Sequence, residues 1–307
     1  MIPFSSQSHT IILENEYMIA EIIPYAASIY QIYIKIGKLL NPVLSTPKTI
    51  DEFLSNTLSY GRTIGRTAGK LYNTQESASY IDFKDEPFFM HGGKEKISTK
   101  LFSIDYKEKH SIGLSYFAPH LSDGYVGDME LKVIFDLEGS NFVVRYEVTS
   151  DRDTLSNITL HPYFNLDQTS NLSSHTLTVF SDKYISINNE GKFDQAVDVK
   201  DTHKDYRLPK LLDINEQTKL DDIYLINQET ALTLETKDIK MNVSSNYPSL
   251  VVYTQNKPTN TDLSNAKTGA LHAGIAIEAQ LPQNKLPILK KGQIYHYWTK
   301  YQFETKN

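Results

Sequence analysis

Residues 131–148 read LKVIFDLEGSNFVVRYEV, and this stretch decides the fold class of the chain. Apolar side chains occupy every second position from 131 to 137, and the alternation resumes from 142 to 148. A period of two is that of a β-strand with one buried face and one exposed face. The residues between the two runs, EGSN (138–141), include glycine and asparagine, which tolerate the positive φ angles of tight turns. The stretch therefore predicts an antiparallel β-hairpin.

Similar patterns extend through the chain. A second hairpin is predicted over residues 232–243, and YHYWTKYQF (295–303) reads as a C-terminal strand. The best helical candidate is short, TIDEFLSN (49–56), in which Thr49 and Glu52 have the spacing of a capping box. Many short strands, broken by turn residues, favour an all-β fold, a large antiparallel β-sandwich with few short helices. Because no linker interrupts the pattern, we expect a single domain over residues 1–307.

Composition excludes several classes of function. The 307 residues carry a net charge of −6, and lysines alternate with acids instead of forming the basic stripe that binds nucleic acid. No apolar run approaches the ~18 residues of a membrane helix, and the first residues do not resemble a signal peptide, so a cytoplasmic protein without membrane contact is expected. There are no cysteines, which removes disulfides and thiolate nucleophiles. Catalysis would have to rest on oxygen and imidazole groups.

Four segments contain polar residues where a strand pattern alone would not place them. They are GRTIGRTAGK (61–70), MHGG (90–93), ITLHPYFNL (158–166) and GIAIEAQLPQN (274–284). None contains a phosphate-binding loop, a dinucleotide fingerprint or a zinc-binding His-Glu-x-x-His pattern. We therefore predict neither a metal nor a nucleotide cofactor.

The last two segments contain the candidate acid and base. Glu278 interrupts an apolar strand, where an unpaired carboxylate is costly unless it is hydrogen-bonded or acts as a base. The alternative is that Glu278 and Gln280 lie together on a solvent face. His161 stands before Pro162, which ends regular strand pairing. It is either a functional imidazole or a structural histidine that bonds a neighbour.

The other candidates are cations, a second histidine and an aspartate. Arg62, Arg66 and Lys70 recur at spacing four, but glycines at the same spacing favour a loop that presents side chains over a helix. A solvated basic surface is the alternative. His91 precedes two glycines, which suits a binding loop and also an ordinary turn. Asp221 precedes a predicted strand and could simply be a turn residue.

In this order, the segments resemble the aldose 1-epimerase family, also called galactose mutarotases, over nearly the whole chain. GRTIGRTAGK is similar to the family's Gly-Arg-x-x-x-Arg-x-Ala segment, and MHGG is similar to its Leu-His-Gly-Gly loop. The most specific matches are SNITLHPYFNL (156–166), similar to Asn-x-x-x-His-[Ser/Pro]-Tyr-Phe-Asn-Leu, and the Glu-Ala-Gln strand around residue 278. The resemblance implies the family's large antiparallel β-sandwich.

The resemblance also implies roles for individual residues. His161 would be the general acid and Glu278 the general base. The sugar would be bound by His91, Asp221, Lys70 and Arg66. Lys70 stands where arginine is common in the family, and this departure concerns which sugar is bound more than the reaction itself.

The expected function is therefore interconversion of the α and β anomers of a free aldose, without a metal or redox cofactor, by a monomer or homodimer. Three alternatives remain. A hexose-6-phosphate 1-epimerase would use the cations of residues 61–70 to hold the phosphate. A glycoside hydrolase would use Glu278 and Asp221 as paired carboxylates. A sugar-binding protein of the same fold would lack turnover.

Overall fold

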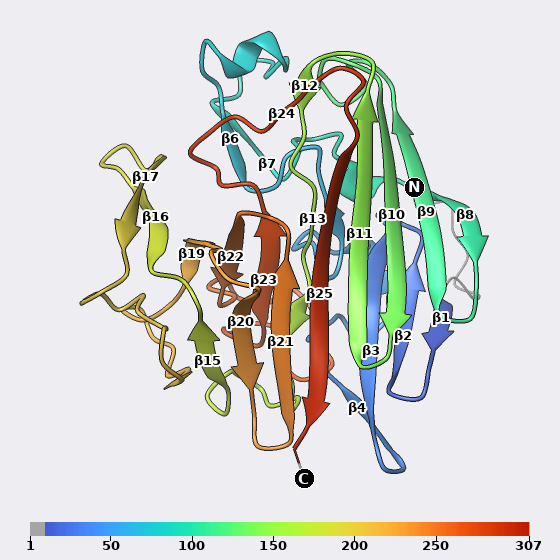
Figure 1. Cartoon of the computed structure of the whole chain (residues 1–307), viewed down its shortest axis with the longest axis vertical. Helices are drawn as coiled ribbons and strands as arrows, with labels where there is room; N and C mark the ends of the chain where they lie inside the picture. Colours follow the sequence, from blue (N-terminus) through green and yellow to red (C-terminus); the bar gives the residue numbers. More distant parts are fainter. Residues whose placement is uncertain (1–9, 307) are drawn as a thin grey trace.

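The computed structural model describes residues 10–306, and its largest element is a nine-stranded antiparallel sheet (Figure 1). In spatial order its strands are β18 (Lys210–Leu211), β15 (Thr176–Val179), β20 (Thr230–Glu235), β21 (Ile239–Ser245), β25 (Tyr295–Thr305), β11 (Asn141–Ser150), β10 (Met129–Glu138), β9 (Ser111–Ala118) and β8 (Ser103–Lys107). Strands β10 and β11 pair without a break around a two-residue turn. The predicted hairpin over residues 131–148, the second hairpin and the C-terminal strand are confirmed.

A six-stranded antiparallel sheet packs against the large sheet. Its strands, in spatial order, are β14 (Tyr163–Phe164), β23 (Ile275–Gln280), β22 (Ser249–Tyr253), β19 (Asp221–Leu225), β16 (Lys183–Ile187) and β17 (Phe193–Asp198). Ile277, Leu250 and Val252 on one face join the main hydrophobic core together with Phe142 and Tyr301 of the large sheet. The opposite face therefore points away from the sandwich core, and Glu278 lies on that face.

A four-stranded sheet contributes to the same core. It consists of β1 (Ile11–Glu14), β2 (Met18–Ile23), β3 (Ser28–Ile36) and β4 (Leu39–Pro42). Three short antiparallel pairs complete the strands: β5 (Thr63–Ile64) with β13 (Thr159–Leu160), β6 (Lys70–Tyr72) with β7 (Phe88–Met90), and β12 (Thr154–Leu155) with β24 (Ile288–Leu289). Residues 10–306 also contain two 3-10 turns, η1 (Ser77–Ser79) and η2 (Ile97–Thr99).

Helix is scarce, as predicted. Within residues 10–306 the single α-helix is α1 (Ile50–Ser55), which begins with the expected capping box. The backbone N–H of Glu52 donates to the Thr49 hydroxyl at 3.2 Å, and the backbone N–H of Thr49 donates to the Glu52 carboxylate at 3.2 Å. The antiparallel β-sandwich is thus confirmed. None of the helices in the described part of the chain is long and apolar enough to cross a membrane. Residues 1–9, which contain part of the segment judged not to be a signal peptide, lie outside the described range.

Candidate functional site

The structure brings His161 and Glu278 together. Nε2 of His161 lies 3.2 Å from Oε1 of Glu278. Both residues are almost inaccessible to solvent, with exposed fractions of 5% and 3%. Glu278 is therefore not a solvent-face residue, and the alternative considered for it from the sequence is wrong.

Strand register explains why these two residues meet. In the antiparallel pair of β14 and β23, Tyr163 lies opposite Ala276. Continuing this register by two residues in each direction places His161 opposite Glu278. Opposite residues of an antiparallel pair point to the same face of a sheet. The ladder stops at Pro162, and the backbone N–H of His161 instead donates to the carbonyl of Arg62 at 3.0 Å.

Burial shifts the pKa values of the two groups in opposite directions. It raises the pKa of Glu278 to about 8, and the nearby charge of Asp221 adds to the rise. It lowers the pKa of His161 to about 4, and the Lys96 ammonium reinforces the effect. Both shifts arise because a low-dielectric environment disfavours the charged form. Between these values the pair shares one proton.

His91 forms the next part of the site. Its ring centroid lies 5.5 Å from that of His161, edge to face. Its Nδ1 accepts a hydrogen bond from the backbone N–H of Gly69 at 3.2 Å, so in the neutral ring the proton resides on Nε2. Burial, reinforced by His161, holds the pKa of His91 well below its ordinary value. Near neutral pH the residue therefore offers one N–H donor and no charge.

The glycine that follows His91 allows a close backbone approach. Gly92 has a φ of +88°, and a Cβ atom there would lie 2.0 Å from the carbonyl oxygen of Gly65. No side chain fits this space, so the MHGG loop rests directly on the 61–70 segment. Gly92 thus makes the close backbone contact that its sequence position suggested.

The structure contradicts the expectation that Arg66 contacts a substrate. Its side chain is fully buried, with Nε 2.8 Å from Asp123 and its other nitrogens donating to the carbonyls of Gly127, Ala118 and Pro119. Arg62 is also buried, and it donates to the carbonyls of Phe53, Leu54 and Ser98. A buried guanidinium is tolerated only with such partners, which other parts of the chain supply. The segment is not helical, as expected, but it turns both arginines inward, so neither presents its charge to solvent.

Lys70 and Asp221 remain accessible. Lys70 is exposed, with Nζ 5.5 Å from the centroid of the Phe88 ring. Asp221 is the first residue of β19 and lies opposite Tyr253 on β22, so it belongs to a strand and not to a turn. Although Asp221 keeps contact with solvent, surrounding protein raises its pKa, Asp222 adds to the rise, and Lys70 opposes it. Charge interactions thus link Asp221 to both Lys70 and Glu278.

The sequence did not single out a cluster of three tyrosines, one of which lies against the histidine. The Tyr163 ring lies 5.0 Å from the His161 ring, 4.8 Å from that of Tyr60 and 6.3 Å from that of Tyr253. Tyr163 lies two residues after His161 in the HPYFNL motif, which was the available signal. Tyr60 and Tyr253 could not be distinguished by pattern from the ordinary aromatic residues of strands. Apolar ring surfaces beside buried polar groups are typical of small-molecule sites.

The titratable groups do not form a metal centre. Across residues 10–306, no three histidine, cysteine, aspartate or glutamate side chains gather closely enough to hold a metal ion. The arrangement instead provides one acid–base pair, one neutral N–H donor and, on two exposed residues, one carboxylate and one ammonium group. This combination suits proton transfer on a neutral, hydroxyl-rich ligand.

Known proteins match this chain over almost its full length. A sequence model of the family described as aldose 1-epimerase matches residues 9–302. The chain is 27% identical to an aldose 1-epimerase of Haemophilus influenzae, with 98% of this chain and 97% of that protein aligned. It is 23% identical to a galactose mutarotase of Homo sapiens, over 95% of this chain and 92% of that one.

Solved structures show the same fold. A homologue of aldose epimerases from C. elegans superposes with a TM-score of 0.87 at 21% identity, covering 97% of this chain and 99% of that chain. A galactose 1-epimerase from Lactobacillus acidophilus superposes with a TM-score of 0.83 at 22% identity, covering 97% and 95%.

Proposed function

The chain belongs to the aldose 1-epimerase family, and from this premise we propose that it interconverts the α and β anomers of a free aldose such as glucose or galactose. One observation carries the proposal. A buried imidazole and a buried carboxyl lie 3.2 Å apart. Anomer exchange needs one proton donor and one proton acceptor at the same carbon centre.

The proposed reaction uses the pair in its Glu278 carboxylate and His161 imidazolium form. Glu278 removes the proton of the C1 hydroxyl while His161 protonates the ring oxygen, and the bond between C1 and the ring oxygen breaks to give an aldehyde. Rotation about C1–C2 presents the other carbonyl face. The two proton transfers then run in reverse and close the opposite anomer. Each positioned transfer typically contributes ~10²- to 10⁴-fold to the rate.

Burial of both groups suits this cycle because His161 and Glu278 together hold one proton before and after ring opening. Ring opening moves one proton from His161 to the sugar and another from the sugar to Glu278, which leaves a neutral imidazole and a neutral carboxyl. That product state is the one that the two pKa shifts favour in the buried site. No charge enters or leaves the site during the reaction.

The surrounding groups are proposed to hold the sugar. The Nε2–H of His91 donates to a sugar oxygen, while the Asp221 carboxylate accepts from hydroxyl groups at the rim. Lys70 contributes an ammonium donor in the place of the family's arginine. Tyr163 and Tyr253 offer ring surfaces to the apolar face of the pyranose.

The burial of Arg62 and Arg66 favours a free sugar over a phosphorylated one as the substrate. The phosphate alternative relied on the three cations of residues 61–70. Arg62 and Arg66 are both buried and donate to groups of the protein itself, which leaves Lys70 as the exposed cation of that segment. A phosphate is normally held by several converging charge-assisted bonds.

The test is the mutarotation rate of freshly dissolved α-D-glucose and α-D-galactose, followed by polarimetry. Glu278→Gln and His161→Asn each remove a proton-transfer group, so we expect each to lower kcat by roughly 10²- to 10⁴-fold while circular dichroism shows a folded protein. The matched controls are Glu147→Gln and His296→Asn. These residues form a partly exposed Glu–His pair at 3.7 Å on the large sheet, and their variants should keep the full rate.

Two results would contradict the proposal. Near-wild-type rates in either catalytic variant would remove the assigned acid or base. A wild-type protein that binds glucose or galactose by calorimetry, yet leaves the mutarotation rate at its uncatalysed value, would be a sugar-binding protein of this fold.

A further inference from the structure

A straight row of side chains crosses the six-stranded sheet and begins at Glu278. Val251 on β22 lies opposite Glu278 on β23, and Ile223 on β19 lies opposite Val251. The register of β19 with β16 continues the row to Ile185. Figure 1 shows these four strands beside one another in the order β23, β22, β19 and β16. Opposite residues of antiparallel strands point to the same face, so the whole row shares the face of Glu278.

Beyond Glu278 the row is apolar. Val251, Ile223 and Ile185 form a buried hydrophobic cluster that is separate from the main core of the sandwich. These side chains contain no polar atom, and the backbones of their strands pair with each other within the sheet. The row therefore offers no hydrogen-bond partner to a ligand that lies on it.

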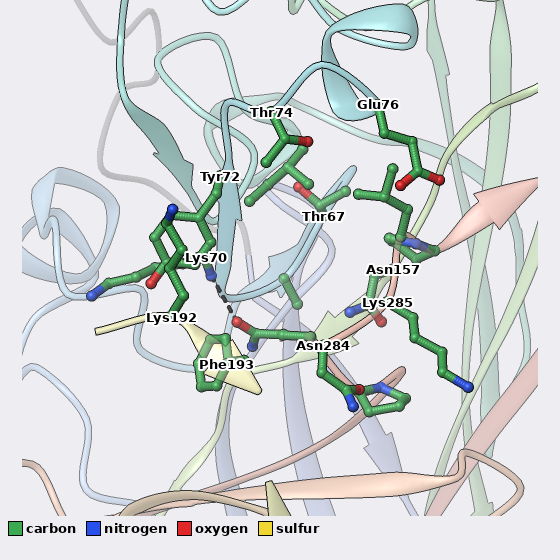
Figure 2. A pocket seen from close by; sticks show the side chains of 16 residues that line it. Thr67, Lys70, Tyr72, Thr74, Glu76, Asn157, Lys192, Phe193, Asn284 and Lys285 are labelled. Carbon is green, nitrogen blue, oxygen red and sulfur yellow. Dashed lines mark hydrogen bonds between the residues drawn. The ribbon is translucent and has the colours of Figure 1, made fainter. Parts of the chain in front are cut away.

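The end of the row that is farther from Glu278 is covered by an aromatic ring. Phe193 on β17 packs against the cluster, and the same residue lines a cavity of about 240 Å³ beside Lys70 (Figure 2). Ile223 and Ile185 have exposed fractions of only 2% and 3%. A ligand therefore meets the cluster at its other end, which is Val251.

Val251 lies directly beside the reacting groups. The Cβ atoms of opposite residues in an antiparallel pair are ~4.5–5.5 Å apart, so the Val251 side chain is the lateral neighbour of the Glu278 carboxyl. The exposed fraction of Val251 is 8%, compared with 3% for Glu278. Val251 is thus at least as open to solvent as the carboxyl, and a sugar that reaches Glu278 also contacts Val251.

The proposed reaction determines how the sugar lies along the row. Its ring oxygen is at His161, and its C1 hydroxyl is at Glu278. C2 is the ring neighbour of C1 on the side away from the ring oxygen. Because β23 lies between the strand that follows His161 and β22, that side of Glu278 is occupied by Val251. The substituent at C2 therefore faces Val251.

The polar groups nearest to Val251 do not serve a hydroxyl at C2. Ser249 and Gln280 form the next pair along the same two strands, but both are inaccessible to solvent, and the Ser249 hydroxyl donates to the carbonyl of Gln280 at 2.7 Å. On the other side of the row, Asp221 lies two strands away from β23, so its carboxylate reaches hydroxyl groups farther from C1. A C2 hydroxyl would lose its water without gaining a partner, which is unfavourable.

We infer that Val251 is a specificity-determining residue, and that the enzyme prefers aldoses without a hydroxyl at C2, the 2-deoxy sugars, over their parent sugars. A C2 methylene makes apolar contact with Val251 and leaves no polar group unpaired. The inference rests on the proposed function, because the ring oxygen and C1 must lie at His161 and Glu278.

The experiment compares 2-deoxyglucose with glucose, and anomer exchange is measured by exchange NMR. We expect the wild-type kcat/KM for 2-deoxyglucose to exceed that for glucose by about tenfold, the effect of one unpaired hydroxyl. Val251→Thr keeps the shape of the side chain but replaces one methyl with a hydroxyl that can bond the C2 hydroxyl. This variant should lower the ratio of the two kcat/KM values by about tenfold, mainly by raising the glucose value. Differences in the intrinsic reactivity of the sugars cancel, because both proteins are given the same two sugars.

Two controls test the position of the contact. Val126→Thr makes the same substitution at a partly exposed residue outside the six-stranded sheet, and it should leave the ratio unchanged. The second control is 6-deoxyglucose, whose altered carbon lies on the ring-oxygen side, at His161. Its kcat/KM relative to that of glucose should change in Val251→Thr only through the glucose value, so its own kcat/KM should rise together with that of glucose.

The outcomes separate the specificity from the reaction. If glucose is turned over but 2-deoxyglucose has no advantage in the wild type, or if Val251→Thr leaves the ratio unchanged, the inference is overturned and the reaction stands. The wild-type comparison needs no variant, so it decides the matter even if Val251→Thr does not fold. If no sugar is turned over, the proposed function fails, and calorimetry with the same two sugars shows whether Val251→Thr shifts binding toward glucose.

Discussion

At the residue scale, the site depends on two groups that are both less stable when charged. His161 and Glu278 are each almost fully buried, so the same environment depresses the pKa of the imidazole and raises that of the carboxyl. The imidazole therefore loses its proton at a lower pH than the carboxyl does, which reverses the ordinary order. The pair holds the one proton that the reaction needs. Arg66 is buried as well, and its guanidinium pairs with Asp123 and donates to several backbone carbonyls.

The residue-scale prediction concerns pH. Below about pH 4 both groups of the pair are protonated and the base is lost, whereas above about pH 8 the shared proton dissociates and the acid is lost. A plot of kcat/KM against pH should therefore be bell-shaped with limbs near these values. Asp221→Asn removes a negative charge that raises the pKa of Glu278, so the alkaline limb should move to lower pH. An alkaline limb that stays in place in this variant would disprove the coupling.

At the element scale, the loop after β7 positions His91 through a backbone contact that only glycine permits. Gly92 rests on the carbonyl of Gly65, and His91 is held by the amide of Gly69, so two parts of the same 61–70 segment support the loop. The segment is not helical, although spacing alone allowed a helix, and it supports both His91 and the backbone of His161.

The element-scale prediction is that Gly92→Ala displaces this loop. The added Cβ atom would meet the Gly65 oxygen at 2.0 Å, and the bond from Gly69 to His91 would be lost. Because misplacement of about 1 Å can cost ~10²-fold in rate, kcat/KM for glucose should fall by roughly that amount. The control is Gly139→Ala in the β10–β11 turn, where φ is also positive but no atom lies within 4 Å. It should lose about 1 kcal/mol of stability and no activity. Equal activities in the two variants would contradict the role of the loop.

At the scale of the whole molecule, two tyrosine hydroxyls tie the functional strands to the rest of the sandwich. Tyr301 on β25 donates to the carbonyl of Ile277, next to Glu278, at 3.2 Å. Tyr247 donates to the carbonyl of Ile158, three residues before His161, at 2.5 Å, and its ring stacks on Tyr297 of β25. The large sheet thereby supports both halves of the catalytic pair.

The whole-molecule prediction is that Tyr301→Phe and Tyr247→Phe each lower the free energy of unfolding. Each removes one buried hydrogen bond and leaves a carbonyl with one partner fewer, which typically costs about 0.5–1.5 kcal/mol. The measurement is the midpoint of urea unfolding. The control is Tyr106→Phe on the exposed strand β8, which removes only an exposed contact between hydroxyls, with Ser111 at 3.2 Å, and should leave the midpoint unchanged. If the buried variants behave like this control, the two hydroxyls do not stabilise the site strands.

The amount predictable from sequence differed between local and distant features. Both hairpins, the C-terminal strand and the capping box of Thr49 and Glu52 depend on neighbouring residues, so periodicity and turn chemistry located them. The Arg66 side chain turns inward because it pairs with Asp123, which is more than fifty positions away. The spacing of residues within its own segment could not reveal this orientation. A cavity beside Lys70 could not be predicted either, because the residues that line it come from four separate segments of the chain.

By itself, the sequence determined that the chain forms antiparallel strands, and its motifs nominated His161 and Glu278, because alternation and local turns need no distant partner. Only the tertiary structure decided that these two residues lie opposite each other, that both arginines turn inward, and which tyrosine ring lies against the imidazole. The physical reason is that burial and electrostatics depend on every group packed around a side chain. Those groups come from strands that are brought together only when the sandwich closes.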